Sequence, residues 1–179
     1  MIQLRDKRST TRRTYDCSQQ MSSLLVPRGV RFIVNDRADI AAMAGASGVH
    51  MGQDDLPVEE ARKICKPPCW VGVSTHNINQ LRAANSTSAD YIAVGPIFPT
   101  VTKENPDPVV GLKLLRAARK LTHKPLVAIG GITLASASEV YAAGADSIAV
   151  IRDLASADDP ATQVRKYLDV AQRRLFTRS

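Results

Sequence analysis

The chain has 179 residues, of which 44% are hydrophobic and 23% charged, a composition typical of one globular domain and not of a disordered chain. Its net charge of +7 lies mainly toward the two ends. Because only 4% of the residues are aromatic and no recognition motif is present, we expect no nucleic-acid partner. No apolar run reaches the roughly 20 residues of a membrane helix, and no signal-peptide pattern opens the chain, which predicts a cytoplasmic protein without a membrane anchor. The three cysteines, Cys17, Cys65 and Cys69, are best interpreted as reduced thiols.

Seven short apolar runs are typical of strands, and helical patterns lie between them. In chain order the predicted strands cover residues 1–5, 30–35, 48–52, 70–75, 91–95, 125–130 and 147–151. One pattern recurs three times, in residues 41–52, 83–95 and 142–151. It consists of a helix that ends in small residues, then a turn, then a β-branched strand.

The helical patterns carry recognisable start and stop signals. Pro57 can open a helix whose first turn holds Glu59 and Glu60, where the helix dipole favours acidic side chains. Thr133 is a predicted N-cap, and Gly144 ends the same helix. In residues 109–121 the predicted apolar face is Val110, Leu114, Ala117, Ala118 and Leu121.

Strict alternation of helices with strands that are apolar on both faces predicts a parallel α/β sheet. Polar residues follow nearly every strand, which favours a closed (β/α)8 TIM barrel over an open doubly wound sheet, because barrel sites are built from all of these loops. The residues at the strand ends are Arg5, Lys7, Asn35, Asp36, Gln53, Asp55, Ser74, Thr100 to Lys103, Gly130, Gly131 and Arg152.

Two of these clusters have both a structural and a functional interpretation. Asn35 with Asp36, and Asp54 with Asp55, are suited to capping the helices that follow, but two carboxylates at adjacent strand ends could also hold one Mg²⁺ together with substrate phosphate. The glycines of "IGGIT", residues 129–133, are typical of a phosphate cradle ahead of a helix.

The segments "QLRDK", "NDRADIA", "GVHMGQDDLP", "GVSTH", "GPIFPTVTK", "AIGGIT" and "AGADSIAVI" carry a family resemblance in their order and spacing. From residue 1 to about residue 153 the chain resembles the thiamine phosphate synthase family. That resemblance implies a Mg²⁺-dependent transferase that joins 4-amino-2-methyl-5-(diphosphooxymethyl)pyrimidine to a thiazole phosphate. The expected products are thiamine phosphate and pyrophosphate, and the expected partners are these small phosphorylated substrates.

The resemblance also implies a role for individual residues. The pyrimidine diphosphate is expected to contact Gln3, Arg5, Lys7, Asn35, Ser74 and Lys103, and Arg5, Lys7 and Lys103 are the expected catalytic cations. The expected Mg²⁺ ligands are Asp36 and Asp55. The thiazole phosphate is expected to contact Thr100, Thr102, Gly131, Ile151 and Arg152. The thiazole nitrogen has no proton to lose, so we expect no histidine to act as general base, and we expect His50 to be a buried residue behind the site.

The chain departs from the family pattern at two places. Arg152 stands where the family usually has serine, and it could either pair with the thiazole phosphate or turn outward and leave the binding to backbone amides. The family's usual first strand and helix are also missing, since the sequence begins at the second strand. We therefore expect one domain, residues 1–179, with seven of the eight barrel units and an incomplete amino-terminal end. The sequence does not indicate which oligomeric state the protein adopts.

Two alternatives use the same fold. A thiazole tautomerase relative would carry histidine after the glycine of "GPIF", where this chain has Pro96, and it would lack the paired aspartates. A non-catalytic truncated barrel is the other alternative, and the intact phosphate and metal residues argue against it.

Overall fold

The computed structural model describes residues 1–100 and 107–176, which fall into two compact units. The first unit contains residues 1–74 and 86–91, and the second contains residues 75–85 and 92–179. In both units short strands alternate with helices along the chain, as the sequence predicts.

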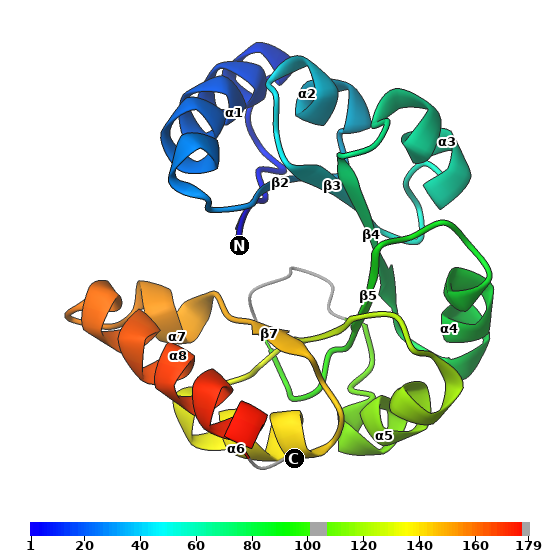
Figure 1. Ribbon diagram of the computed structural model, residues 1–179, viewed down its shortest axis with the longest axis vertical. Helices are drawn as coiled ribbons and strands as arrows, with labels where there is room; N and C mark the ends of the chain where they lie inside the picture. Colours follow the sequence, from blue (N-terminus) through cyan, green and yellow to red (C-terminus); the bar gives the residue numbers. More distant parts are fainter. Residues whose placement is uncertain (101–106, 177–179) are drawn as a thin grey trace. The chain divides into compact units, whose positions relative to one another are not determined.

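The first unit is a parallel α/β layer (Figure 1). Its strands are β1 (Ile2–Leu4), β2 (Phe32–Asn35), β3 (Gly48–Met51) and β4 (Trp70–Thr75), and its helices are α1 (Thr11–Leu25), η1 (Val26–Arg28), α2 (Ala38–Met43) and α3 (Val58–Ile64). Each strand pairs in parallel with the next in chain order. Ile2 lies opposite Phe32, Ile33 opposite Gly48, and Gly48 opposite Trp70.

The second unit repeats this arrangement. Its elements are α4 (Ile78–Asn85), β5 (Tyr91–Val94, which begins in the first unit), α5 (Gly111–Leu121), β6 (Leu126–Ile129), α6 (Leu134–Ala142), β7 (Ser147–Ala149), α7 (Arg152–Ala155) and α8 (Pro160–Phe176). Strands β5, β6 and β7 pair in parallel in that order, and α8 packs beside α6 (Figure 1). The prediction of seven parallel strands alternating with helices is therefore confirmed.

The interior strands form the core of each unit. The four residues of β3 and the four of β5 are all buried, which matches the expectation of strands that are apolar on both faces. Strands β1 and β7 differ, since two of the three residues in each are exposed. The exposed large side chains include Met1 and Ile2 at β1.

The predicted helix signals are confirmed, but one predicted apolar face is fully buried only at Ala118. Thr133 and Ser136 form a capping box at α6, and Glu59 and Glu60 lie in the first turn of α3. In α5, however, Leu121 is 40% exposed. The buried stripe is instead Leu115, Ala118 and Thr122, which is the predicted face rotated by one residue.

None of the helices in the described ranges has the length and apolar character required to cross a bilayer. Cys17, Cys65 and Cys69 are all free thiols.

Candidate active site

In the first unit, polar side chains from the ends of β1 and β2 form a connected group. The Gln3 amide donates to Asn35 Oδ1 at 3.4 Å, and Asn35 Nδ2 donates to Asp36 Oδ1 at 2.6 Å. The Lys7 ammonium forms an ion pair with the other oxygen, Oδ2, of Asp36. The structure therefore brings together four of the residues that were predicted to share one site.

Asp36 has a left-handed backbone, with φ of 64°, and no other non-glycine residue in the described ranges has positive φ. Its amide donates to the carbonyl of His50 at 2.8 Å, and the amide of Arg37 donates to the carbonyl of Asn35 at 2.8 Å. Aspartate tolerates this region better than most residues do, although it still costs free energy. Strained backbone of this kind is often retained where a side chain must be aimed at a ligand.

The carboxylate of Asp55 lies close to that of Asp36. Burial raises the pKa of Asp36, the Lys7 ammonium opposes that shift, and hydrogen bonding with Asp55 adds to it. Asp55 Oδ2 also accepts the amide of Gly52 at 2.7 Å, which holds the carboxylate in place. Two close, partly buried carboxylates repel each other when both are ionised, and a divalent cation removes this repulsion.

This donor set fits Mg²⁺, which prefers carboxylate oxygens and commonly takes one or two of them together with substrate phosphate. The described residues contain no group of three or more His, Cys, Asp or Glu side chains that could form an all-protein metal cage. Asp36 and Asp55 are thus suited to a cation that phosphate and water also coordinate.

Arg5 lies apart from this connected group. Its side chain is exposed and forms no hydrogen bond or ion pair with residues 1–100 or 107–176. Contacts with the described residues therefore do not hold the Arg5 side chain in place, and its predicted contact with a diphosphate stays a prediction.

Ser74, at the end of β4, is held from two sides. Its hydroxyl lies 2.8 Å from Nε2 of His50, and its carbonyl accepts the amide of Gln53 at 2.6 Å. His50 Nδ1 lies 3.0 Å from the hydroxyl of Tyr91. Burial lowers the pKa of His50 to about 4, against the opposing influence of Asp55, so the imidazole is neutral near pH 7.

His50 is thus buried behind Ser74, as predicted, but the sequence did not indicate its partners. Gln53 was predicted only as a polar residue at a strand end, and no role was predicted for Tyr91. Tyr91 follows an apolar pattern as the first residue of a strand, and no sequence signal marks its hydroxyl as a hydrogen-bonding group.

In the second unit, the loop after β5 lies against the glycine pair after β6. The amide of Ile97 donates to the carbonyl of Ile129 at 2.8 Å, and the amide of Phe98 donates to that of Gly130 at 3.1 Å. Gly130 and Gly131 both have positive φ, 88° and 66°. A Cβ at Gly131 would lie 2.5 Å from the carbonyl oxygen of Pro99, so only glycine fits this close approach.

The remaining predicted thiazole-phosphate residues lie at other strand ends of the second unit. Thr100 is half-buried at the end of the described part of the loop after β5. Ile151 is 56% exposed after β7, and Arg152, also exposed, is the first residue of α7. Thr102 and Lys103 lie outside the described residues, and their roles stay predictions.

His76 contacts two residues of the loop after β5. Its Nδ1 lies 2.6 Å from the carbonyl of Gly95, and its Nε2 lies 3.5 Å from Asp107 Oδ2. The sequence indicated no partner for this histidine. Its contacts are with the protein on both ring nitrogens, which is consistent with a structural role.

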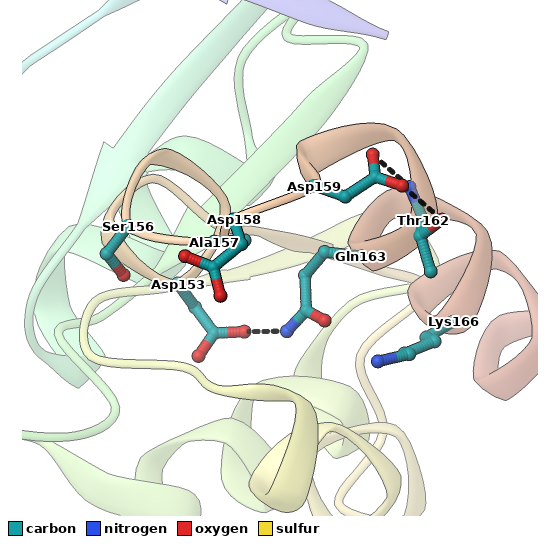
Figure 2. Close-up of a pocket in the computed structure, with 8 residues that line it drawn as sticks. All are labelled: Asp153, Ser156, Ala157, Asp158, Asp159, Thr162, Gln163 and Lys166. Carbon is teal, nitrogen blue, oxygen red and sulfur yellow. Dashed lines mark hydrogen bonds between the residues drawn. The ribbon is translucent and has the colours of Figure 1, made fainter.

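Two surface pockets contain none of the predicted site residues. One, of about 380 Å³, lies between α7 and α8 and is lined by Asp153, Ser156, Ala157, Asp158, Asp159, Thr162, Gln163 and Lys166 (Figure 2). Asp153 there accepts hydrogen bonds from Gln163 at 2.8 Å and from Tyr167 at 2.6 Å.

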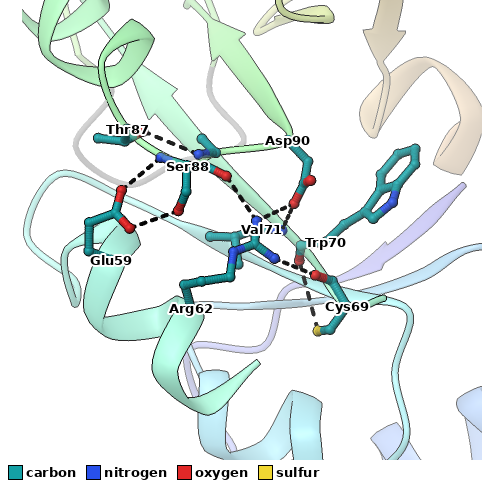
Figure 3. A network of polar contacts seen from close by, with 9 residues as sticks. Glu59, Arg62, Cys69, Trp70, Val71, Thr87, Ser88 and Asp90 are labelled. Carbon is teal, nitrogen blue, oxygen red and sulfur yellow. Dashed lines mark hydrogen bonds and ion pairs between the residues drawn. The ribbon is translucent and has the colours of Figure 1, made fainter. Parts of the chain in front are cut away.

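The second pocket, of about 450 Å³, lies beside a polar network in the first unit (Figure 3). Arg62 is its centre, donating to the carbonyls of Cys69 and Ser88 and to the carboxylate of Asp90. Asp90 in turn accepts the amide of Val71 at 2.7 Å. Because these groups satisfy one another, the network serves the packing of α3 against β4.

Comparison with known proteins gives consistent results. A family model described as thiamine monophosphate synthase matches residues 1–154. The thiamine-phosphate synthase of Koribacter versatilis is 49% identical over 170 residues, which cover 95% of this chain and 79% of that protein. The thiamine-phosphate synthase of Methanospirillum hungatei is 45% identical, with 95% of this chain and 82% of that protein covered.

The structural comparison agrees with the sequence comparison. The thiamine phosphate pyrophosphorylase from Pyrococcus furiosus matches with a TM-score of 0.88 and 33% identity, covering 97% of this chain and 83% of that one. These similarities support the synthase interpretation over the tautomerase and non-catalytic alternatives.

Proposed function

Because the chain belongs to the thiamine monophosphate synthase family, we propose that it joins 4-amino-2-methyl-5-(diphosphooxymethyl)pyrimidine to a thiazole phosphate with Mg²⁺ as cofactor. The observation that carries the proposal is the connected group of Gln3, Asn35, Asp36 and Lys7, with Asp55 beside it. It combines amide donors, an ammonium and two carboxylates, which is the chemistry required to hold a diphosphate together with a divalent cation.

In the proposed reaction, the C–O bond to the diphosphate breaks and the diphosphate leaves with the bonding electrons. The aminopyrimidine stabilises the resulting benzylic-type cation, and the thiazole nitrogen then forms the new C–N bond with its lone pair. Bound Mg²⁺ would be held by Asp36 and Asp55 and would neutralise charge on the leaving diphosphate. No proton is transferred in this step, so no protein base is required.

The protein's own groups bind and orient the two substrates. Arg5, Lys7 and Lys103 supply positive charge where negative charge develops on the leaving group. Gln3 and Asn35 hold the diphosphate through their amides, and the Ser74 hydroxyl meets the pyrimidine. In the structure without substrate, Lys7 pairs with Asp36, and we propose that it turns to the diphosphate when this ligand binds.

The thiazole phosphate is assigned to the loops of the second unit. Gly131 and the backbone at Ile151 offer amides to the anion, and Thr100 and Thr102 offer hydroxyls. Arg152, which is exposed, can add a charge-assisted contact that the usual serine cannot.

The finer fold assignment and the cell location belong to the same proposal. Seven parallel βα units with polar residues at the strand ends support a TIM-type (β/α)8 architecture, whose sites lie at the carboxyl ends of the strands. Three free cysteines are consistent with a reducing compartment such as the cytoplasm.

The experiment that tests the proposal measures pyrophosphate release from the purified chain with both substrates present. We expect release that requires Mg²⁺, stops when EDTA is added, and is absent when either substrate is omitted. Release that proceeds equally without Mg²⁺ would contradict the metal assignment, and no release with both substrates would contradict the function.

A further inference from the structure

Three side chains of the first unit form a hydrogen-bonded chain that ends at the candidate site. The Tyr91 hydroxyl lies 3.0 Å from Nδ1 of His50, and Nε2 of the same ring lies 2.8 Å from the hydroxyl of Ser74. Tyr91 and His50 are buried, with 4% and 8% of their surface exposed, whereas Ser74 is partly exposed at the end of β4. This series of hydrogen bonds therefore runs from the core to a surface where a ligand can bind.

The backbone fixes the position of the tyrosine ring. Gly72 of β4 lies opposite His50 of β3, and a Cβ at this glycine would come within 2.0 Å of the Tyr91 ring. The Tyr91 and His50 rings stack, with centroids 5.5 Å apart and an angle of 25° between their planes. The tyrosine is thus confined to a place where its hydroxyl reaches His50.

The hydrogen-bonding protons of Tyr91, His50 and Ser74 can be counted. A neutral imidazole has one N–H and one acceptor nitrogen, and each hydroxyl has one proton to donate. Both ring nitrogens of His50 face hydroxyl oxygens, and no carboxylate in the described ranges bonds to the ring, so the buried ring is neutral. The question is which nitrogen carries the hydrogen.

The Tyr91 hydroxyl decides this question. Within the described residues its only hydrogen-bond partner is Nδ1 of His50. If Nδ1 carried the hydrogen, the buried tyrosine proton would have no acceptor in the part of the chain that the structure describes, which is unfavourable. Tyr91 must therefore donate to Nδ1, the hydrogen must lie on Nε2, and Nε2 must donate to the oxygen of Ser74.

We propose that Tyr91 and His50 are positioning residues that make Ser74 a hydrogen-bond donor toward the substrate, and that the acceptor is a ring nitrogen of the pyrimidine. Ser74 accepts from His50, so its own proton points elsewhere, and no described residue accepts it. The identity of the acceptor rests on the proposed function. The opposite tautomer would leave Ser74 only lone pairs, with which it could bind the exocyclic amino group.

The proposal predicts a specificity. A pyrimidine ring nitrogen accepts a hydrogen bond, whereas C–H at the same ring position cannot, and the N–H of an oxo-pyrimidine would meet the Ser74 proton as a second donor. The site should therefore disfavour both kinds of analogue.

The first test determines the tautomer in the substrate-free protein. With ¹⁵N-labelled histidine, the ring nitrogens of His50 can be assigned among only three histidines by comparison with His50→Asn. We expect a pyridine-type shift for Nδ1 and a pyrrole-type shift for Nε2. The reverse assignment, or a doubly protonated ring at pH 7, would overturn the proposal without any reference to activity.

The second test measures binding of the pyrimidine diphosphate and of the pyridine analogues in which one ring nitrogen is C–H. We expect the parent to bind one analogue about 3- to 10-fold more weakly, the size of one neutral hydrogen bond. Ser74→Ala should bind the substrate and that analogue equally. Tyr91→Phe should reduce the discrimination and add little to it in the Ser74→Ala background.

Tyr167→Phe is the matched control, because it removes a tyrosine hydroxyl of the second unit that bonds to Asp153. It should leave the discrimination unchanged even if it lowers stability. Equal discrimination by the parent and Ser74→Ala would overturn the ring-nitrogen contact. If the parent has the expected tautomer but binds neither substrate nor analogue, the proposed function fails and the assigned acceptor fails with it. Only the direction of the hydrogen bond from His50 to Ser74, which the first test determines, would then stand.

Discussion

At the scale of single residues, Asp36 combines the strongest local signals of the candidate site. Its backbone is left-handed, its carboxylate pairs with Lys7 and accepts from Asn35, and Asp55 interacts with it. An ion pair whose lysine is half exposed contributes little to stability, and a second carboxylate beside it adds repulsion, so stability alone explains this arrangement poorly. The arrangement is better explained by ligand binding.

We predict that Asp36→Asn and Asp55→Asn each lower turnover by about 10²–10³-fold, because each removes a charge that would hold the cation at the leaving group. Asparagine also tolerates positive φ, so Asp36→Asn should keep the backbone of the strand end. The measurement is the rate of pyrophosphate release as a function of Mg²⁺ concentration, with melting temperature as the control for folding. Parent-like rates at limiting Mg²⁺ in both variants would remove the metal assignment.

Gly131 allows a second prediction about a single residue, because Gly111 provides a matched control. Both have positive φ, 66° and 67°, but a Cβ at Gly111 would meet no atom of the described residues within 4 Å, while one at Gly131 would meet the carbonyls of Phe98 and Pro99. Gly111→Ala should therefore cost about 1–2 kcal/mol in unfolding free energy, the cost of left-handed backbone alone.

Gly131→Ala should cost more than Gly111→Ala and should also raise the half-saturating concentration of thiazole phosphate, because the loop that leads to Thr100 must move. Denaturant unfolding and steady-state kinetics on the two variants check this. Equal losses in both variants would show that the contact with the loop after β5 does not constrain the site.

The sequence predicted the residues of this site better than their contacts. The family resemblance assigned Gln3, Asn35, Asp36 and Lys7 to one site, and the structure brings these four side chains into contact, while their roles toward substrate stay predictions. The supporting contacts of Tyr91 and Gln53 could not be predicted. They depend on which side chains face each other across strands, and this requires the register.

At the scale of elements, Arg62 links α3 to the strand ends around it. It is mostly buried and donates to two carbonyls and to Asp90, which also accepts the Val71 amide (Figure 3). Arg62→Ala should therefore lower the unfolding free energy by about 2–3 kcal/mol, since it leaves charged and carbonyl groups without their donor.

The neighbouring Lys63 is the control for Arg62, because its pair with Glu60 is largely exposed. Lys63→Ala should change the unfolding free energy by less than about 0.5 kcal/mol. Chemical denaturation of the two variants at constant pH compares them directly. A larger loss in Lys63→Ala than in Arg62→Ala would show that the network contributes little to stability.

The contact between α7 and α8 predicts a dependence on pH. The hydroxyl of Tyr167, followed by the amide of Gln163, holds the pKa of Asp153 below its ordinary value of 3.8. Figure 2 shows the contact with Gln163. A lowered pKa in the folded state means stability that is present above about pH 4 and is lost as pH falls through the folded pKa.

Tyr167→Phe should raise the pKa of Asp153 toward 3.8 and lower stability at pH 7 by about 1–2 kcal/mol. It should have less effect on stability in acid than at neutral pH. The ¹³C shift of the Asp153 carboxyl during acid titration measures the pKa, and denaturation at both pH values measures the stability. An unchanged carboxyl titration in the variant would contradict the assigned cause.

The element prediction succeeded where periodicity is strong and failed where it is ambiguous. All seven strands were located, but the buried face of α5 was displaced by one residue. Leu114 and Leu115 are adjacent, so both faces of that helix carry leucine. The residues that α5 packs against determine which leucine is buried, and the local pattern does not contain this information.

At the scale of the whole molecule, the two units share one design but each has one strand that is much less buried than the others. In the first unit this strand is β1, and in the second it is β7, each with two exposed residues of three. Gln3 belongs to β1 and Ile151 follows β7 closely, so both strands lead to predicted substrate contacts. If these contacts form as predicted, substrate binding should change the local stability of both strands.

We predict that the amides of β1 and β7 exchange with deuterium faster than those of β3 and β6, because local opening costs least where few apolar groups are buried. Strand β3, buried at all four residues, is the control within the first unit, and β6, buried at three of four, serves the second. Hydrogen exchange followed by mass spectrometry or NMR measures the difference.

Binding of the pyrimidine diphosphate should slow exchange at β1 more than at β3, because Gln3 would then gain a ligand contact. Protection of β1 and β7 equal to that of β3 and β6 in the free protein would show that another surface covers these strands in solution.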